Sequence, residues 1–253
     1  MSLVMAVCGK GGTGKTTLSA LLIRSLMKKG MKPILAVDAD PNANLAPALA
    51  IAVEQTVGQV LEEFHGQKLT IPEGMSKQAY LELRLNQAVA EAKGIDLLAM
   101  GRPEGPGCYC SANSVLRDML ERLTENYRYV VLDNEAGMEH LSRRTANRID
   151  VLLMVTDPSM KGMRTVRGLL DLVAELKLPI VKKYLVVSRA VDLDPRLMEM
   201  VKDLEVPLLG MVPEDPQVKE FDLETRSFLE LPDDCAAAQA AERMMEKLSA
   251  EWQ

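Results

Sequence analysis

The stretch Gly9-Lys10-Gly11-Gly12-Thr13-Gly14-Lys15-Thr16 decides the fold of this chain, because it matches the phosphate-loop pattern G-x-x-x-x-G-K-S/T. Glycines are needed there because successive backbone N–H groups turn inward around phosphate oxygens, and side chains would block that approach. In such a loop Lys15 reaches the β- and γ-phosphates, and the hydroxyl of Thr16 holds Mg²⁺. The nucleotide contacts expected from this segment are Gly9, Gly11, Gly12, Thr13, Gly14, Lys15, Thr16 and Thr17.

The residues on either side of the loop have the patterns of the strand and the helix that a phosphate loop requires. The apolar run Leu3–Cys8 has the length of a buried parallel strand. After the loop, apolar residues recur at helical spacing from Leu18 to Leu26, and Gly30 stands where the helix would end. The helix would direct the positive end of its dipole at the phosphates. A glycine-rich turn without a ligand is the alternative, and the order strand, loop, helix argues against it.

Apolar runs of strand length alternate with helical patterns along the whole chain. The predicted strands are Leu3–Cys8, Pro33–Asp38, Ile95–Met100, Arg128–Asp133, Asp150–Thr156, Val181–Ser188 and Leu208–Val212. The predicted helices are Leu18–Lys29, Ser76–Ala92, Ala112–Glu125, Met163–Leu176, Pro195–Leu204 and Cys235–Glu251. This alternation predicts an α/β fold with a mostly parallel sheet and helices on both faces, forming a single P-loop NTPase domain over residues 1–253. Ligands of such sheets bind at the carboxyl ends of the strands.

Composition excludes several classes of protein. The chain has 253 residues, of which 47% are hydrophobic, and its net charge is −6. An acidic balance argues against a nucleic-acid-binding surface, which normally carries a basic stripe. No apolar run approaches the ~18 residues of a membrane span, and no basic segment precedes a signal-like apolar stretch. We therefore expect a cytoplasmic protein that binds neither nucleic acid nor membrane, with its four cysteines reduced and with Cys8 and Cys235 as small buried side chains.

Two aspartates follow the second predicted strand, in Asp38-Ala39-Asp40-Pro41. Carboxylates at the carboxyl end of a strand can orient a water molecule and reach the outer shell of a metal ion. Pro41 ends the strand because it has no N–H to donate to the sheet. A surface turn rich in Asp and Asn is the alternative interpretation.

A second segment that is expected to lie beside the phosphate loop is Tyr129-Val130-Val131-Leu132-Asp133-Asn134-Glu135-Ala136-Gly137. An apolar strand that ends in an aspartate is typical of a Walker-B element, which places Asp133 near Mg²⁺. Gly137 would allow the backbone to approach the γ-phosphate and to move when that group leaves.

The cysteine pair in Gly107-Cys108-Tyr109-Cys110 predicts a metal site. Thiolates are soft ligands that favour Zn²⁺, Cu(I), Ni²⁺ or an iron–sulfur cluster. Two ligands cannot complete a four-coordinate site, but two chains related by a two-fold axis would supply four. A pair of free thiols in a loop is the alternative, and a disulfide across so short a ring would be strained.

Lys10 has no role in an ordinary phosphate loop, and with it the chain resembles the deviant-Walker-A ATPases in the motif GKGGTGKTT and over essentially its whole length. That superfamily includes the nitrogenase iron protein, the MinD and ParA positioning ATPases and the Mrp-type iron–sulfur carriers. The resemblance implies an ATPase that converts ATP to ADP, in which Lys10 crosses a homodimer interface to the partner's nucleotide. It also implies that Asp40 orients the attacking water, that Asp38 supports it and that Asp133 binds Mg²⁺ through water. Lys10, Lys15 and Asp40 are thus the expected catalytic residues.

Two segments resemble the CooC-type nickel-insertion ATPases, which mature carbon monoxide dehydrogenase, and the similar accessory ATPase of acetyl-CoA synthase. These segments are GCYCSANS at 107–114 and AGMEHLSRRTA at 136–146. The resemblance implies that Cys108 and Cys110 bind Ni²⁺ or Zn²⁺ at the dimer interface, and that a nickel enzyme such as carbon monoxide dehydrogenase is the client.

The sequence departs from the superfamily at Val187-Ser188-Arg189, where relatives usually have Asn-Lys. The amide of that Asn normally recognises the adenine edge, and serine is too short to make both hydrogen bonds. Recognition of the base is therefore expected to rest more on Pro213 and Glu214.

Two other functions are compatible with the phosphate loop. An iron–sulfur carrier or electron-transfer ATPase of the nitrogenase-iron-protein type would need a second cysteine in Asp133–Arg144, which contains none. A MinD- or ParA-like positioning ATPase would bind a membrane or DNA surface, which the acidic charge opposes.

Overall fold

The computed structural model describes residues 2–65, 71–101, 121–135 and 148–252. Their centre is an eight-stranded sheet with the strand order β3-β4-β2-β5-β1-β6-β7-β8. The strands are β1 (Leu3–Gly9), β2 (Ile34–Asp38), β3 (Val89–Ala92), β4 (Ile95–Ala99), β5 (Tyr129–Asp133), β6 (Ile149–Thr156), β7 (Ile180–Ser188) and β8 (Leu208–Val212). Every neighbouring pair is parallel except β3 with β4. The expected α/β architecture is confirmed.

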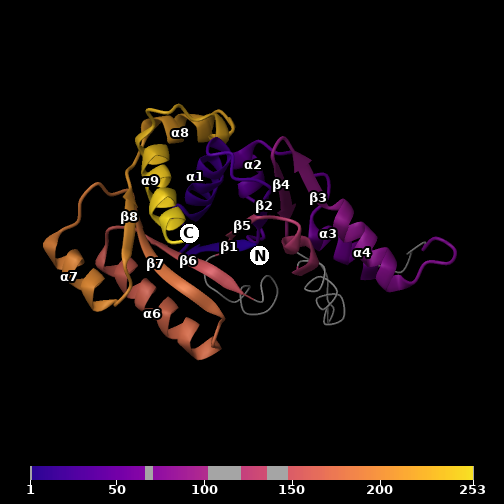
Figure 1. The fold of residues 1–253 in the computed structure, drawn as a ribbon, viewed down its shortest axis with the longest axis horizontal. Helices are drawn as coiled ribbons and strands as arrows, with labels where there is room; N and C mark the ends of the chain where they lie inside the picture. Colours follow the sequence, from indigo (N-terminus) through magenta and orange to yellow (C-terminus); the bar gives the residue numbers. More distant parts are fainter. Residues whose placement is uncertain (1, 66–70, 102–120, 136–147, 253) are drawn as a thin grey trace.

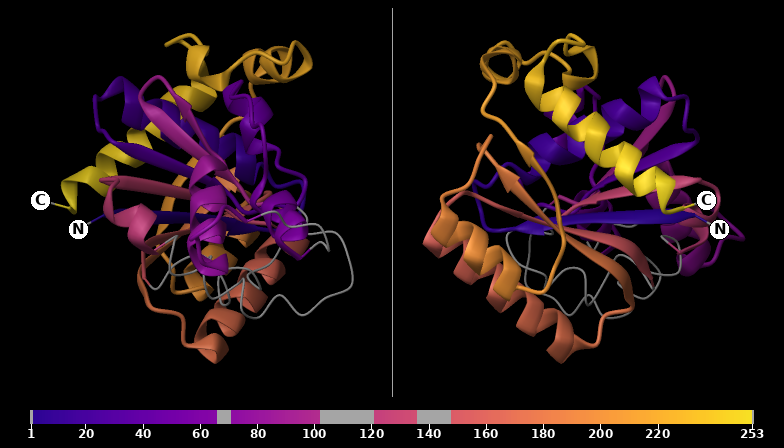
Figure 2. Two further views of the ribbon diagram at one scale, coloured as in Figure 1. Left: turned by 90° about the vertical axis from the view of Figure 1, so that its right-hand side faces the viewer. Right: turned by 60° about the vertical axis from the view of Figure 1, so that its left-hand side comes forward.

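Helices cover both faces of the sheet, as Figures 1 and 2 show. The helices are α1 (Lys15–Lys28), α2 (Leu45–Leu49), α3 (Val57–His65), α4 (Lys77–Gln87), α6 (Met160–Leu176), α7 (Pro195–Asp203), α8 (Pro216–Leu223), η2 (Phe228–Glu230) and α9 (Ala236–Ala250). The α1, α2, α8 and α9 helices pack on one face, and α6 and α7 pack on the other. The central strands are buried on both sides, which explains their continuous apolar runs.

The predicted helix Ser76–Ala92 is wrong in its last part. Its N-terminus is correct, because the Ser76 hydroxyl accepts a hydrogen bond from the amide of Ala79 and caps α4. The helix ends at Gln87, and Val89–Ala92 forms strand β3, antiparallel to β4. A turn at Gly94, where φ is +89°, allows this hairpin to close. The helical pattern of the sequence thus extends to Ala92, but from Val89 onward pairing with β4 determines the backbone conformation.

Three α-helices of the described residues have no counterpart among the predicted ones: α2, α3 and α8. Each has fewer than ten residues, so its apolar pattern is too short to stand out. Of the predicted helix Ala112–Glu125, the last five residues are described, and they are helical.

The C-terminal helix α9 is a central part of the core. Its Ala237, Ala241, Met245 and Leu248 are at most 1% exposed, and the helix packs against α1, which follows the phosphate loop. In the part of the chain that the structure describes, no helix is both long and apolar enough to cross a membrane. Cys8 and Cys235 are buried free thiols, as expected.

Candidate phosphate-loop site

The phosphate loop lies at the carboxyl edge of the sheet, directly after β1. Gly9 is the last residue of β1 and pairs with Val155 of β6. A Cβ atom at position 9 would lie 2.2 Å from the carbonyl oxygen of Val155, so glycine is required for this close approach. Gly12 and Gly14 have φ values of +78° and +84°, which lie in the left-handed region that favours glycine. These glycines give the loop the backbone shape of a phosphate cradle.

The main-chain carbonyl of Lys10 closes the loop. It accepts hydrogen bonds from the Thr13 hydroxyl (2.8 Å), from the Thr13 amide (3.3 Å) and from the Lys15 ammonium (3.2 Å). The Lys15 side chain thereby lies folded back over the loop, with only 8% of the residue exposed. The side chain of Lys10 itself is exposed. The two lysines therefore occupy different environments, one inside the cradle and one at its surface.

Asp38 and Asp133 lie side by side at the ends of neighbouring strands. They are register partners in the β2–β5 ladder, and Asp133 also pairs with Val7 of β1. The Ser19 hydroxyl on α1 donates to Oδ1 of Asp133 at 3.0 Å. Burial raises the pKa of Asp133 to about 6, although hydrogen bonds from Thr16 and Ser19 act in the opposite direction. Asp133 is thus held beside the Thr16 hydroxyl, as a Walker-B aspartate requires.

Asp38 shapes the segment that carries Asp40. Its carboxylate accepts hydrogen bonds from the amide of Asp40 (3.1 Å) and from the amide of Leu45 (2.7 Å). Asp38 is fully buried, and this burial raises its pKa to about 7. Asp40 is partly exposed, and it accepts hydrogen bonds from the amide and the side chain of Asn42. Asp38 thus positions the backbone around Asp40, and the Asp40 side chain remains partly exposed.

Three residues of this site were not predicted from the sequence. Ser19 lies one helical turn after Thr16, so helical spacing could have indicated it. Asn134 is 2% exposed and donates to the Val7 carbonyl at 2.9 Å, which ties the end of β5 to β1. Arg189 donates to the Gly12 carbonyl at 2.6 Å from a residue 177 positions away, and no local pattern could have indicated that contact.

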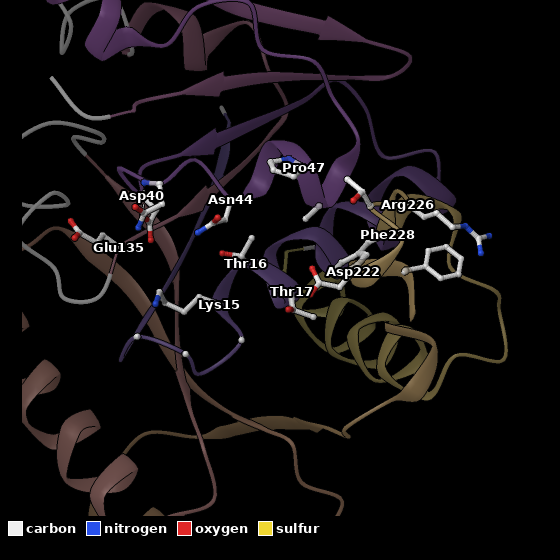
Figure 3. Close-up of a pocket in the computed structure, with 17 residues that line it drawn as sticks. Lys15, Thr16, Thr17, Asp40, Asn44, Pro47, Glu135, Asp222, Arg226 and Phe228 are labelled. Carbon is white, nitrogen blue, oxygen red and sulfur yellow. Dashed lines mark hydrogen bonds between the residues drawn. The ribbon is translucent and has the colours of Figure 1, made fainter. Parts of the chain in front are cut away.

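A cavity of about 630 Å³ opens in front of the loop, between α1, α2 and α8. Figure 3 shows Lys15 and Thr16 on one side of it, with Asp40 and Glu135 nearby and Asp222 farther along the wall. Two of the three expected catalytic residues, Lys15 and Asp40, line this cavity, and Lys10 does not.

A second cavity, of about 280 Å³, lies on the other flank of the loop. Pro213 and Glu214 line it, together with Ser188, Arg189 and Thr17. The two residues expected to recognise the base therefore line one cavity together with part of the phosphate loop.

The Ser188 hydroxyl, in the wall of this second cavity, donates a hydrogen bond of 3.1 Å to the Thr156 carbonyl. The side chain of Glu214 forms an ion pair with Lys219 at the rim, which lowers the pKa of Glu214. Glu214 and Lys219 are thus paired with each other in the lining of this cavity.

The residues present fit a magnesium-bound nucleotide. Oδ2 of Asp133 and Oδ1 of Asn134 are buried acceptors without a hydrogen-bond partner among the described residues. An orphan carboxylate oxygen beside the Thr16 hydroxyl is a donor set that suits Mg²⁺ and its water ligands.

Cys108, Cys110 and Gly137 lie outside the described residues, as do both segments that resemble the CooC-type ATPases. Within the described ranges, no group of three or more His, Cys, Asp or Glu side chains is arranged to hold a metal ion. The nickel or zinc site at the cysteine pair stays a prediction.

Comparison with known proteins agrees with the geometry. The model of the CobQ/CobB/MinD/ParA nucleotide-binding domain matches residues 4–228. The chain is 40% identical over 252 residues to an uncharacterized ATP-binding protein of Methanocaldococcus jannaschii, covering 97% of this chain and 98% of that protein. It is 32% identical to the carbon monoxide dehydrogenase accessory protein CooC of Rhodospirillum rubrum, over 68% of this chain and 69% of CooC.

Among solved structures, the septum site-determining protein MinD of Pyrococcus horikoshii, complexed with Mg-ADP, has a TM-score of 0.72 and 23% identity. The alignment covers 100% of this chain and 98% of that one, and it shows that the two share a fold. With the phosphate cradle, the paired aspartates and the match over residues 4–228, the chain belongs to the CobQ/CobB/MinD/ParA family of nucleotide-binding domains.

Proposed function

We propose that this chain is a Mg²⁺-dependent ATPase that forms a homodimer with bound nucleotide and carries nickel to a client enzyme such as carbon monoxide dehydrogenase or acetyl-CoA synthase. The observation that carries the proposal is that the two lysines lie in different environments: Lys15 lies in the cradle, while the Lys10 side chain is exposed beside it. An exposed cation next to a phosphate site is available to a second chain. The similarity to CooC and the pair Cys108 and Cys110 support nickel as the cargo.

Each group of the site has a task in hydrolysis. Bound Mg²⁺ would neutralise charge on the β- and γ-phosphates, and Thr16 and Asp133 are the residues that would hold it. Lys15 leaves the Lys10 carbonyl and places its ammonium on the phosphate oxygens, where charge develops during transfer. Asp40 orients the attacking water, because Asp38 fixes the backbone on both sides of it. Lys10 of each chain adds a positive charge to the nucleotide of the other.

The metal would sit where two copies of Cys108 and Cys110 meet. Four thiolates would complete a four-coordinate site, and each chain would supply half of it. Closure of the dimer on ATP would then assemble the site, and hydrolysis would open it for delivery. Nickel is the substrate of this cycle, while Mg²⁺ and ATP drive it.

An anaerobic titration with Ni²⁺, in the presence and absence of Mg-ADP and Mg-ATP, tests the proposal. We expect about one nickel ion per two chains and a dimer by sedimentation when nucleotide is present. The variant Cys108→Ser with Cys110→Ser should lose this nickel while keeping nucleotide affinity. Cys235→Ser is the matched control, since serine keeps an O–H to donate to Asp215, and it should bind nickel normally.

Equal nickel binding by the double cysteine variant would contradict the proposal. An anaerobically purified protein that is brown and absorbs in the iron–sulfur region would instead support the iron–sulfur carrier. Both outcomes leave the ATPase assignment to be judged separately by phosphate release.

A positioning ATPase of the MinD type is the second candidate, because MinD of Bacillus subtilis is 25% identical over 227 residues. The apolar face of α9 is buried in the core, so this helix cannot also lie in a membrane interface. Binding of the intact protein to anionic liposomes in the presence of ATP would support this candidate over the nickel carrier.

A further inference from the structure

The edge strand β8 and the helix α9 enclose a groove that the nucleotide site does not use. β8 is the last strand of the sheet as formed by the described residues, and among these one side of its backbone has no neighbouring strand. A cavity of about 460 Å³ runs along that side, between Leu209–Met211 of β8 and Ala236, Ala240 and Met244 of α9. Figure 1 shows α9 beside β8 on this border of the molecule. Gly210, Ala236 and Ala240 contribute little or no side chain to the lining, and the Met244 side chain lies against Gly210.

The backbone of β8 presents an acceptor to this groove. The carbonyl oxygen of Leu209 faces α9, where it accepts a hydrogen bond of 2.8 Å from the Lys247 ammonium, and a bound strand would share or replace this donor. An unpaired edge of this kind accepts a further extended segment by main-chain hydrogen bonds. The face of α9 from Ala236 to Lys247 is about 16 Å long, at 1.5 Å per residue, which is the length of about five residues of strand. β8 itself has five residues.

Charge along α9 is separated by face. Glu242 forms ion pairs with Arg24 and Lys28 of α1, and Glu246 forms one with Lys29. The acidic side chains of α9 are therefore neutralised by basic residues of the same chain. The two basic residues that line the groove, Arg243 and Lys247, form no ion pair with a carboxylate in the described ranges. The groove thus presents two positive charges on a chain whose net charge is −6.

An exposed apolar side chain marks one end of the groove. Val191 is 79% exposed and lines the same cavity, next to Ala190 and near Pro213. A β-branched side chain so exposed is suited to contact an apolar residue of a bound strand. Pro213 lines both this groove and the cavity expected to receive the base, so an occupant of the groove would lie beside the nucleotide.

We propose that the groove between β8 and α9 binds an extended segment of a partner protein in which acidic and apolar residues alternate. The segment adds a strand to the edge at β8, and its carboxylates pair with Arg243 and Lys247. Its apolar residues lie over Met211 and Val191. This function does not depend on nickel or on the cysteine pair, because it uses a different surface.

The test is an NMR titration of the ¹⁵N-labelled full chain with a ten-residue peptide of alternating Val and Glu. We expect saturable shifts of the amides of Leu209, Gly210 and Met211, while a peptide of alternating Val and Lys causes none. The variant Arg243→Glu with Lys247→Glu should bind the acidic peptide at least about tenfold more weakly. Lys93→Glu, a charge reversal at the β3–β4 turn on the opposite edge, is the matched control and should bind normally.

A second variant keeps the test valid if the charge reversal disturbs α9. Val191→Asp changes an exposed side chain, and its charge should weaken binding of the acidic peptide by repulsion. Thermal unfolding and ADP affinity should stay as in the wild type. Absence of binding, equal binding of the basic peptide, or shifts confined to other strands would overturn the proposal. So would a dimer by sedimentation that Val191→Asp dissociates, since a second copy would then be the occupant.

Discussion

Asp38 and Asp133 stand at the ends of adjacent strands, where the sequence places two carboxylates near a metal-binding hydroxyl. The structure adds that both are buried, and burial shifts each carboxyl group toward its neutral form, with a pKa of about 7 for Asp38 and about 6 for Asp133. Binding of Mg²⁺ with a nucleotide reverses this preference, because a cation beside the carboxylate favours its charged form. At the scale of single residues, the site therefore couples nucleotide binding to proton release below neutral pH.

The raised pKa of Asp133 predicts a specific dependence of stability on pH. An acid whose pKa rises from 3.8 unfolded to about 6 folded stabilises the protein fully below pH ~4, and this contribution is lost as the pH rises through 6. Asp133→Asn keeps an oxygen that accepts from Ser19 but does not ionise. Without Mg²⁺, the free energy of unfolding of the wild type should fall relative to this variant by up to about 3 kcal/mol between pH 4 and pH 7, at about 1.4 kcal/mol per pKa unit.

Urea unfolding of both proteins across that pH range measures this difference. Glu199→Gln, which removes an exposed carboxylate from α7, is the control and should follow the wild type. A constant difference between wild type and Asp133→Asn at all pH values would show that the carboxylate is already ionised in the free protein.

At the scale of elements, Asp215 joins the beginnings of two helices. Its carboxylate accepts from the amide of Gln217 at the start of α8 (2.9 Å) and from the amide of Ala237 at the start of α9 (3.2 Å). It also accepts from the Cys235 thiol. Although burial acts in the opposite direction, these donors hold the pKa of Asp215 below its ordinary value. The Asp215 side chain thus connects the wall of the second cavity to the buried helix α9.

We expect Asp215→Ala to lower the free energy of unfolding by about 2–4 kcal/mol, because it leaves buried donors of two helices without an acceptor. The comparable change Asp194→Ala removes the exposed cap of α7, which accepts from the Arg196 amide, and should cost about 1 kcal/mol. Denaturant unfolding at pH 7 compares the two. Equal losses would mean that Asp215 caps α8 alone.

At the scale of the whole molecule, the exposed Lys10 predicts a separation of binding from hydrolysis. Its carbonyl closes the loop, and its side chain is exposed, as the role in the proposed dimer requires. Lys10→Ala should therefore keep ADP affinity within about twofold, while ATP hydrolysis falls at least about 100-fold, as for other cations supplied in trans. Lys93→Ala, remote from the loop, should hydrolyse normally. Phosphate release and sedimentation with ATP measure both properties, and unchanged hydrolysis by Lys10→Ala would contradict the role of this lysine in the dimer.

The sequence alone determined the layered α/β fold, the phosphate loop and the strands that end in Asp38 and Asp133, because these depend on local patterns: an apolar run, a glycine spacing, a helical period. It also singled out Ser188, although not the Thr156 carbonyl that its hydroxyl contacts. Only the tertiary structure decided that residues 89–92 leave the helix to pair with β4, and that Arg189 holds the loop. Contacts between segments far apart in the chain, and the burial that shifts a pKa, arise from packing and leave no local pattern to detect.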